Sequence, residues 1–268
     1  MKKILALMLA LLMMLTLVAC SDEEKGGDGS GIDMTVTSND QYFAVGNDYD
    51  DQFKYEYVNG NQVAITGFAS SHVPHAITIP TKINDRPVVE IAAQAFYNCK
   101  RITSVTIPEG ITKIGNLAFS DCTVLTTVTL PRTLASLGDA AFSGCTLLNA
   151  PTFGSNITSI GYAAFYNCKS IKEVELPNSL TEISDQLFMK CDNLTKVSFG
   201  ESVTKIGAHA FSSCKKLSEI VDGYPTTLTE VGAYAFANCE SLAAPDWVNN
   251  DDDGITVGEY AYHNTKNA

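Results

Sequence analysis

A single motif recurs through most of the chain at an almost constant interval. Seven cysteines follow one another at intervals of 23, 23, 23, 23, 23 and 25 residues, and a phenylalanine stands three positions before each. The pairs are Phe96/Cys99, Phe119/Cys122, Phe142/Cys145, Phe165/Cys168, Phe188/Cys191, Phe211/Cys214 and Phe236/Cys239. A fixed period in this range is typical of a solenoid, in which each unit buries its apolar face against its neighbours.

Each unit has two halves with different hydrophobic patterns. Within 114–122 the apolar residues fall at i, i+4, i+5 and i+8, on one face of a short helical turn. A Val-x-Leu alternation with threonines follows within 127–130, which is typical of a short strand, and Pro131 closes it. The sequence therefore predicts an α/β repeat solenoid, a right-handed coil of short parallel strands and short helical turns.

The combined motif, I-G-x-x-A-F-x-x-C-x-x-L-x-x-V-x-I-P, resembles the BspA-like leucine-rich repeats of bacterial surface proteins. The resemblance covers residues 53 to about 265. It implies a leucine-rich repeat fold and an association with adhesion to host extracellular proteins, to host cells and to other bacteria. In the better-known leucine-rich repeat the pattern is L-x-x-L-x-L with an Asn or Cys ladder, whereas here the cysteine precedes the strand and a proline follows it.

Both ends of the solenoid, expected over 91–268, are predicted to be capped. Residues 53–65 predict a β-hairpin with an Asn59-Gly60 turn, and we place a β cap at 53–90. Residues 257–265 repeat the motif with tyrosine and threonine, which indicates a polar capping half-repeat. Irregular turns are expected where the motif is broken, at Pro151 and Phe153, at Ser184 and Leu187, and at Asp222 beside the two-residue insertion.

The first residues predict an exported protein. Lys2 and Lys3 precede an apolar run that ends in Leu17-Val18-Ala19-Cys20, which resembles the lipobox of bacterial lipoproteins. We expect a signal peptide over 1–19, acylation of Cys20 and a flexible acidic, Gly-rich tether over 20–52. A plain secretory signal is the alternative. The acidic residues behind Cys20 resemble a surface-export signal, so we expect an outer-membrane protein facing outward, with the periplasmic orientation left open.

The composition limits the possible partners. The net charge is −12, and loss of Lys2 and Lys3 with the signal peptide makes it −14. Such an acidic chain argues against nucleic acid and anionic membrane surfaces as partners, so contact with the membrane is expected only through the lipid anchor. We expect a monomer. No nucleotide-binding or catalytic motif occurs, and no cofactor is predicted.

The seven periodic cysteines admit two interpretations. Neighbouring repeats would bring them close enough for disulfides, but an odd number and parallel side chains fit pairing poorly. The positions instead predict small, buried, inert thiols. No C-x-x-C pair occurs, and the His72-x-x-His75 pair lacks a third ligand in a matching frame, so no zinc site is expected.

A weak calcium candidate lies near the C-terminus. Asn249, Asp251 and Asp253 match the opening of a calcium-binding loop, with Gly254 at the turn. The bidentate glutamate expected eleven residues after Asn249 is absent, because Tyr260 stands there. A solvated acidic insertion explains the same residues.

The solvent-facing strand positions form the candidate binding surface. They are small or polar residues at equivalent positions of successive repeats: Ser104, Thr106, Thr127, Thr129, Thr152, Glu173, Glu175, Lys196, Ser198 and Glu219. They lack the aromatic side chains that usually dominate protein interfaces. Tyrosines occur instead near the predicted helical turns, at Tyr97, Tyr162, Tyr166 and Tyr234, where single exposed tyrosines carry little information.

These observations favour a non-catalytic, lipid-anchored surface protein whose solenoid binds a macromolecule, a protein or a glycan on a host or neighbouring cell. The alternative is a scaffolding lipoprotein of the envelope with a partner in the same cell. Which face of the solenoid binds is left open by the sequence.

Overall fold

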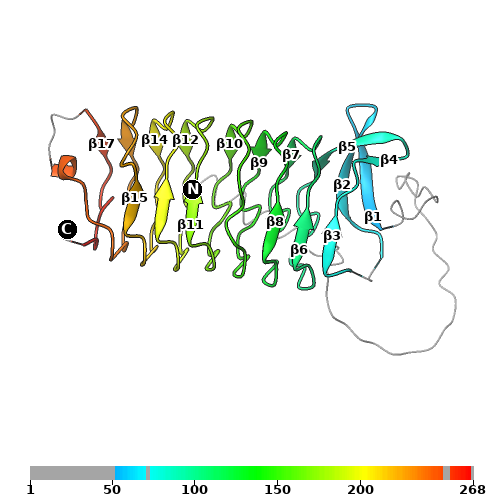
Figure 1. The fold of residues 1–268 in the computed structure, drawn as a ribbon, viewed down its shortest axis with the longest axis horizontal. Helices are drawn as coiled ribbons and strands as arrows, with labels where there is room; N and C mark the ends of the chain where they lie inside the picture. Colours follow the sequence, from blue (N-terminus) through cyan, green and yellow to red (C-terminus); the bar gives the residue numbers. More distant parts are fainter. Residues whose placement is uncertain (1–51, 71–72, 250–253, 267–268) are drawn as a thin grey trace.

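The computed structural model describes residues 52–70, 73–249 and 254–266. These residues form an elongated stack of coils, with the hairpin β1 (Phe53–Val58) and β2 (Gln62–Phe68) at one end and β17 (Thr256–Val257) at the other (Figure 1). This stack of coils is the architecture that the repeat period predicts. Within the described residues, no helix has the length and apolar character needed to cross a membrane.

The N-terminal end begins with the predicted hairpin. β1 and β2 pair antiparallel, and Asn59 and Gly60 between them have φ values of 50° and 77°, as a tight two-residue turn requires. A second hairpin joins β4 (Lys82–Ile83) to β5 (Arg86–Ile91), which pairs in parallel with β2. Phe53 is buried and its ring lies 6.2 Å from that of Phe96, so the hairpin covers the first repeat.

One side of the stack carries three-residue strands that pair in parallel within two groups of successive repeats. In all but the last of them a buried central residue lies between two outward-facing ones, which matches the predicted alternation. The strands form two separate sheets: β3 (Ala76–Thr78), β6 (Ser104–Thr106) and β8 (Thr127–Thr129), then β11 (Glu173–Glu175), β13 (Lys196–Ser198) and β15 (Glu219–Val221).

A second set of parallel strands, each two residues long, lies on another side of the coil. The side with the three-residue strands was the only one that the sequence predicted as sheet. The second set consists of β7 (Lys113–Ile114), β9 (Ser136–Leu137) and β10 (Ser159–Ile160), which extend the sheet of β5, and of β12 (Glu182–Ile183), β14 (Lys205–Ile206), β16 (Glu230–Val231) and β17.

The segments predicted as short helical turns are not α-helical. In every repeat the residues five and one positions before the cysteine, or before Thr265 in the last unit, have left-handed φ values; we call them the first and second left-handed positions. The first positions are Gln94, Leu117, Ala140, Ala163, Gln186, His209, Tyr234 and Tyr260, and the second are Asn98, Asp121, Gly144, Asn167, Lys190, Ser213, Asn238 and Asn264.

Hydrogen bonds between repeats explain this conformation. Alternate N–H groups of each turn donate to carbonyls of the next repeat, as in Phe119 N to Ala141 O at 2.8 Å and Asp121 N to Ser143 O at 2.7 Å. A continuous helix would direct those groups to acceptors within its own turn instead. Because the stack satisfies them across repeats, it stabilises left-handed residues that cost roughly 1–2 kcal/mol each for most side chains. Of the described residues, only Asp246–Asn249 (η1, a 3-10 helix) are helical.

The phenylalanines and cysteines form two buried ladders through the core. The rings of Phe119 and Phe142 stack 5.1 Å apart and differ by 1° in orientation, and the other pairs from Phe96 to Phe236 are similar. The Cys145 thiol donates to the carbonyl of Phe119 at 3.1 Å, and the other cysteines from Cys122 to Cys239 make the equivalent bond.

The structure confirms that Cys99 to Cys239 are buried thiols that are not joined by disulfide bonds. Burial raises the pKa of Cys145 to about 12, so this thiol stays protonated and keeps its hydrogen bond to the core. Each of these carbonyls also accepts a backbone hydrogen bond within its own repeat, such as Cys122 N to Phe119 O at 3.2 Å. The thiol of the next repeat adds a second hydrogen bond that a simple hydrophobic residue could not supply.

Both sets of strands are interrupted in the same part of the chain. No strand forms at 151–154, where Pro151 stands at the central strand position and has no N–H to donate, and neither β8 nor β11 pairs with a strand of this repeat. The second interruption separates β10 from β12. The sequence predicted irregular turns at Pro151 and at Ser184, and both lie at these interruptions.

The second interruption has a steric cause at Ser184. In neighbouring repeats this position is glycine, and a Cβ on Gly161 or Gly207 would lie 2.5 or 2.6 Å from a backbone nitrogen of the preceding repeat. Ser184 carries such a Cβ, so the two repeats cannot approach as closely. Its hydroxyl donates to the carbonyl of Ile160, in the place where glycine repeats have a backbone hydrogen bond, such as Gly207 N to Ile183 O.

The C-terminal end is closed by aromatic side chains. The last coil continues the stack, since β17 pairs with β16 and Tyr262 stacks on Phe236 at 5.1 Å. Trp247 of η1 lies edge-on to Tyr224 and to Tyr262, at 5.3 and 6.0 Å between ring centres. In Figure 1 this short helix lies at the end of the stack.

Candidate functional site

The predicted binding residues lie on the outer surface of the three-residue strands. Ser104 pairs with Thr127 and Thr106 with Thr129, while Glu173 pairs with Lys196 and Glu175 with Ser198. We call this surface the strand face; in register, it consists of Ser104, Thr106, Thr127, Thr129, Glu173, Glu175, Lys196, Ser198 and Glu219. Thr152 is exposed, but it follows Pro151 in the segment without a strand and therefore does not pair in register with Thr129.

The two sheets of the strand face differ in charge. The first presents serine and threonine hydroxyls, whereas the second alternates Glu173, Lys196 and Glu219 along its column. Lys196 Nζ lies 3.0 Å from Glu219 Oε2, and the hydrogen bond to that carboxylate raises the lysine pKa. Both groups are about half exposed, so water screens the pair and it contributes little to stability.

The remaining predicted sites gain no geometry from the structure. Cys20, His72, Asp251 and Asp253 lie outside the described residues, and Asn249 ends η1. His75 Nδ1 lies 2.9 Å from the carbonyl of Arg101. Within the described ranges, no three His, Cys, Asp or Glu side chains lie together as a metal site would require.

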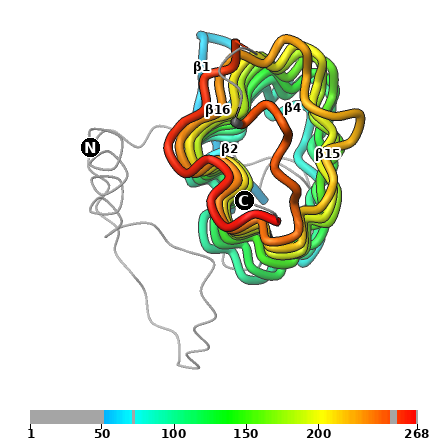
Figure 2. Tube along the Cα trace, turned by 90° about the vertical axis from the view of Figure 1, so that its left-hand side faces the viewer, coloured from blue at the N-terminus to red at the C-terminus, as the bar shows by residue number. Residues whose placement is uncertain are grey.

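A pocket of about 340 Å³ lies on a different side of the solenoid, which we call the turn face, formed by the segments that contain the left-handed positions. In the view along the stack, the chain bends inward on this side, next to β16 (Figure 2). The pocket is lined by Tyr97, Leu117, Ser120, Asp121, Ala140, Ser143, Tyr162, Ala163, Tyr166, Gln186 and Met189.

Small side chains create this turn-face pocket. Ala140 and Ala163 occupy first left-handed positions, and Ser120 and Ser143 stand two positions before their cysteines. Ser120, Ala140 and Ala163 are buried and form the floor, while half-buried larger residues form the walls. The backbone ladder continues beneath the pocket, so the hollow results from side-chain size alone.

The wall at Asp121 is fixed by its neighbours. Gly144 has φ 75°, and a Cβ there would lie 2.2 Å from Asp121 Oδ1, so the glycine leaves room for the carboxylate. Lys100 Nζ donates to the backbone carbonyl of Asp121 at 2.6 Å. The pKa of Tyr97 is raised by burial, by the charge of Asp121 and by a hydrogen bond to its carboxylate. Tyr97 therefore stays a neutral donor at physiological pH.

The opposite wall consists of two tyrosines. Burial raises the pKa of Tyr162, with smaller contributions from Asp185, Tyr166 and Asp139. Lys190 Nζ lies 5.3 Å from the centre of the Tyr166 ring, which is within cation–π range. These contacts hold the aromatic side chains without removing them from solvent.

Farther along the same face, large side chains fill the equivalent positions. His209, Tyr234 and Tyr260 follow at first left-handed positions, and their rings stack at 5.0 and 5.2 Å. Tyr260 is 58% exposed at the end of this stack. The turn face thus has an open region around the pocket and a region that stacked aromatic rings occupy.

Tyr97, Tyr162 and Tyr166 are predicted from the sequence only to lie near the turns, without a binding role. Tyr97 and Tyr166 are three repeat periods apart, so each looks isolated along the chain. A signal is visible when the repeats are aligned on their cysteines: Ser120 and Ser143 share a column with Tyr97 and Tyr166 on either side. Ala140 and Ala163 share a second column, between Leu117 and Gln186.

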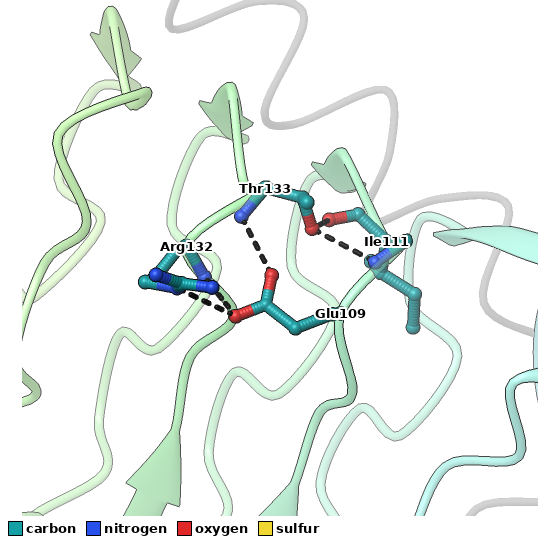
Figure 3. Close-up of polar contacts among 5 residues, drawn as sticks. Glu109, Ile111, Arg132 and Thr133 are labelled. Carbon is teal, nitrogen blue, oxygen red and sulfur yellow. Dashed lines mark hydrogen bonds and ion pairs between the residues drawn. The ribbon is translucent and has the colours of Figure 1, made fainter.

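A carboxylate on the loop edge illustrates how polar residues connect the repeats (Figure 3). Glu109 accepts hydrogen bonds from the backbone N–H groups of Arg132 and Thr133, at 3.2 and 3.1 Å, and pairs with the Arg132 guanidinium. These bonds, the first from Arg132 N–H, lower the pKa of Glu109. Because both backbone N–H groups and the Arg132 Nε bond to this one carboxylate, we interpret the cluster as a structural contact between two repeats.

Comparisons with known proteins agree with this architecture. The sequence profile described as "BspA type Leucine rich repeat region" matches residues 89–218 and 146–268, in six copies. No curated protein matches the sequence. Among solved structures, a leucine-rich repeat protein from T. pallidum is 29% identical with a TM-score of 0.70, over 78% of this chain and 96% of that one.

Two further structures share the fold. A leucine-rich cell surface protein from Faecalibacterium prausnitzii is 25% identical with a TM-score of 0.59, over 82% of this chain and 73% of that one. A leucine-rich repeat protein from Bacteroides ovatus is 23% identical with a TM-score of 0.59, over 83% and 68%. With its phenylalanine and cysteine ladders and the family match over most of the repeats, this chain belongs to the BspA-type leucine-rich repeat family.

Proposed function

We propose that this protein is a non-catalytic, lipid-anchored protein of the bacterial cell surface that attaches to a macromolecule through its solenoid. The observation that carries the proposal is the continuous stack of BspA-type repeats, because such proteins are generally binding proteins and a solenoid presents an extended surface. The similar F. prausnitzii protein is described as a cell surface protein, which supports the location.

The strand face is the part of the solenoid that we propose for contact with a protein partner. Its outward residues are exposed or half-buried and lie in register over successive repeats, so a partner could contact several equivalent positions at once. The first sheet presents hydroxyls and the second alternating charges, so a complementary partner would bind in one orientation along the stack.

The anchor is tested at Cys20. We expect Cys20→Ser to block acylation and to move the protein from the membrane fraction to the soluble fraction, with Cys99→Ser as the control that keeps the anchor. If Cys20→Ser stayed in the detergent phase on partitioning, the lipoprotein assignment would be wrong.

Surface exposure is tested by protease treatment of intact cells that carry the wild-type protein. Adhesion requires that the solenoid be cleaved while a periplasmic marker stays intact. Protection of the solenoid until the outer membrane is opened would instead support the scaffolding alternative, with a partner inside the envelope.

A further inference from the structure

The turn-face pocket has a size and opening that fit one ring. Its volume of about 340 Å³ is near the lower end of small-molecule sites, which span roughly 300–1,000 Å³. The tyrosines of its walls are only half-buried, so a group that fills the pocket can remain attached to a chain outside it. The site therefore suits a terminal unit of a polymer better than a folded element of a partner.

The charge of the pocket favours a neutral ligand. Asp121 is the one acidic residue among its lining side chains, and none of them is basic. The negative charge of Asp121 acts on its neighbour Tyr97, whose pKa it raises in addition to burial, and the Lys100 ammonium donates to the backbone carbonyl of Asp121 at 2.6 Å. An anionic ligand would meet this carboxylate, and a cationic ligand would meet a charge that its neighbours partly offset.

The lining combines aromatic faces with hydrogen-bonding groups that both donate and accept. Tyr97, Tyr162 and Tyr166 supply ring faces, whose negative quadrupole attracts the C–H groups of a saturated ring. Gln186 offers an amide, Ser143 a hydroxyl and Asp121 a carboxylate, which can bond to several hydroxyls. A pyranose ring presents both kinds of surface, C–H groups on its faces and hydroxyls around its edge.

We propose that the turn-face pocket binds a neutral pyranose ring at the end of a glycan chain. The proposal extends the proposed function by naming a ligand class and a second binding surface. It rests on that function only in one respect, that the protein meets the glycan at the cell surface. Binding to the purified protein does not depend on location. Failure of the protease test would thus remove surface adhesion and leave this site in place.

The experiment uses the full chain in detergent with methyl glycosides of glucose, galactose, mannose and N-acetylglucosamine. Saturation-transfer NMR detects binding, and titration gives Kd. We expect at least one glycoside to bind in the millimolar range, on the order of 1–10 mM. N-acetylphenylalaninamide serves as the mimic of a protein side chain.

Ala140→Leu fills the pocket and is the decisive variant. Leu117 already occupies the same first left-handed position one repeat earlier, with φ 59° against 52° for Ala140, so the backbone accommodates leucine there. We expect it to weaken glycoside binding by about tenfold or more, while circular dichroism and thermal unfolding show an intact fold. Tyr166→Ala should also weaken binding by removing one ring face.

Two matched variants locate the effect. Tyr234→Ala removes a tyrosine from the filled part of the turn face, and Glu173→Ala changes the strand face; neither should alter the glycoside Kd by more than about twofold. No glycoside binding up to about 20 mM, binding that Ala140→Leu leaves intact, or preferential binding of N-acetylphenylalaninamide in the pocket would each overturn the proposal.

Discussion

The open and filled parts of the turn face share one backbone and differ in side chains. Around Ala140 and Ala163 the first left-handed positions carry methyl groups, and a pocket lies above them. At His209, Tyr234 and Tyr260 the same positions carry stacked rings. The comparison shows that hydrogen bonds between repeats fix the scaffold, while single residues in one column decide whether the surface has a hollow. Substitutions in the scaffold and substitutions in this column should therefore have different effects, which can be measured.

The largest effect on stability is expected in the phenylalanine ladder, because the open and the filled parts of the turn face share this buried core. Phe165 lies beneath the open part, and its ring stacks on Phe142 and Phe188 at 5.6 and 5.4 Å. Phe165→Ala should remove this buried area, leave a cavity and lower the free energy of unfolding by about 3–5 kcal/mol. Glu173→Ala on the strand face should change it by less than about 0.5 kcal/mol. Urea denaturation measures both, and equal losses would contradict the inward and outward assignments.

The next effect concerns the close approach of the repeats. A Cβ on Gly207 would lie 2.6 Å from the backbone nitrogen of Asp185, so Gly207→Ala should separate β12 from β14 and cost about 1–3 kcal/mol. Hydrogen exchange should be faster in the variant at the backbone amide of position 207, which in the wild type donates to the Ile183 carbonyl. Ser184→Ala is the control, because this repeat already accommodates a Cβ and loses only the hydroxyl contact with Ile160. A stability loss as large in the control would refute the steric explanation.

A smaller effect is expected from emptying the filled part. Tyr234→Ala removes the ring between His209 and Tyr260 and should lower stability by about 1 kcal/mol, as is usual for an exposed aromatic pair. If stacking is what closes this region, the variant should also raise the solvent accessibility of His209, measured by its rate of chemical modification. An unchanged rate would mean that the region is closed by something other than the tyrosine.

The smallest effect depends on pH and compares Glu109 with Asn178. The Asn178 amide accepts a hydrogen bond from Glu201 N at 3.0 Å, as the Glu109 carboxylate does from Arg132 N. The pKa of Glu109 is lowered from its ordinary value near 4.5, so its contribution is present above that pH and is lost as the pH falls through the folded-state pKa. The difference in unfolding temperature between wild type and Glu109→Gln should therefore shrink between pH 7 and pH 3. The effect of Asn178→Ala should stay constant, and a Glu109→Gln difference that grew on acidification would reverse the assignment.

Much of the fold follows from the repeat itself. The period of Phe119, Cys122 and their equivalents predicted the ladders, and the Val-x-Leu alternation predicted which strand residues face outward. The positions of Pro151 and Ser184 predicted where the stack is irregular. These features depend on burial and on local covalent properties, which a single sequence displays directly.

The turn conformation and the pocket were decided only by the tertiary structure. The spacing of Ala118, Phe119 and Cys122 fits a helical turn, but the stack offers backbone acceptors in the next repeat, and those stabilise left-handed residues instead. The pocket likewise joins Tyr97 to Tyr166 across three repeat periods. The sequence by itself determined which residues are buried, because burial follows from periodicity; the structure decided which surface residues meet, because that depends on how closely and at what angle the repeats stack.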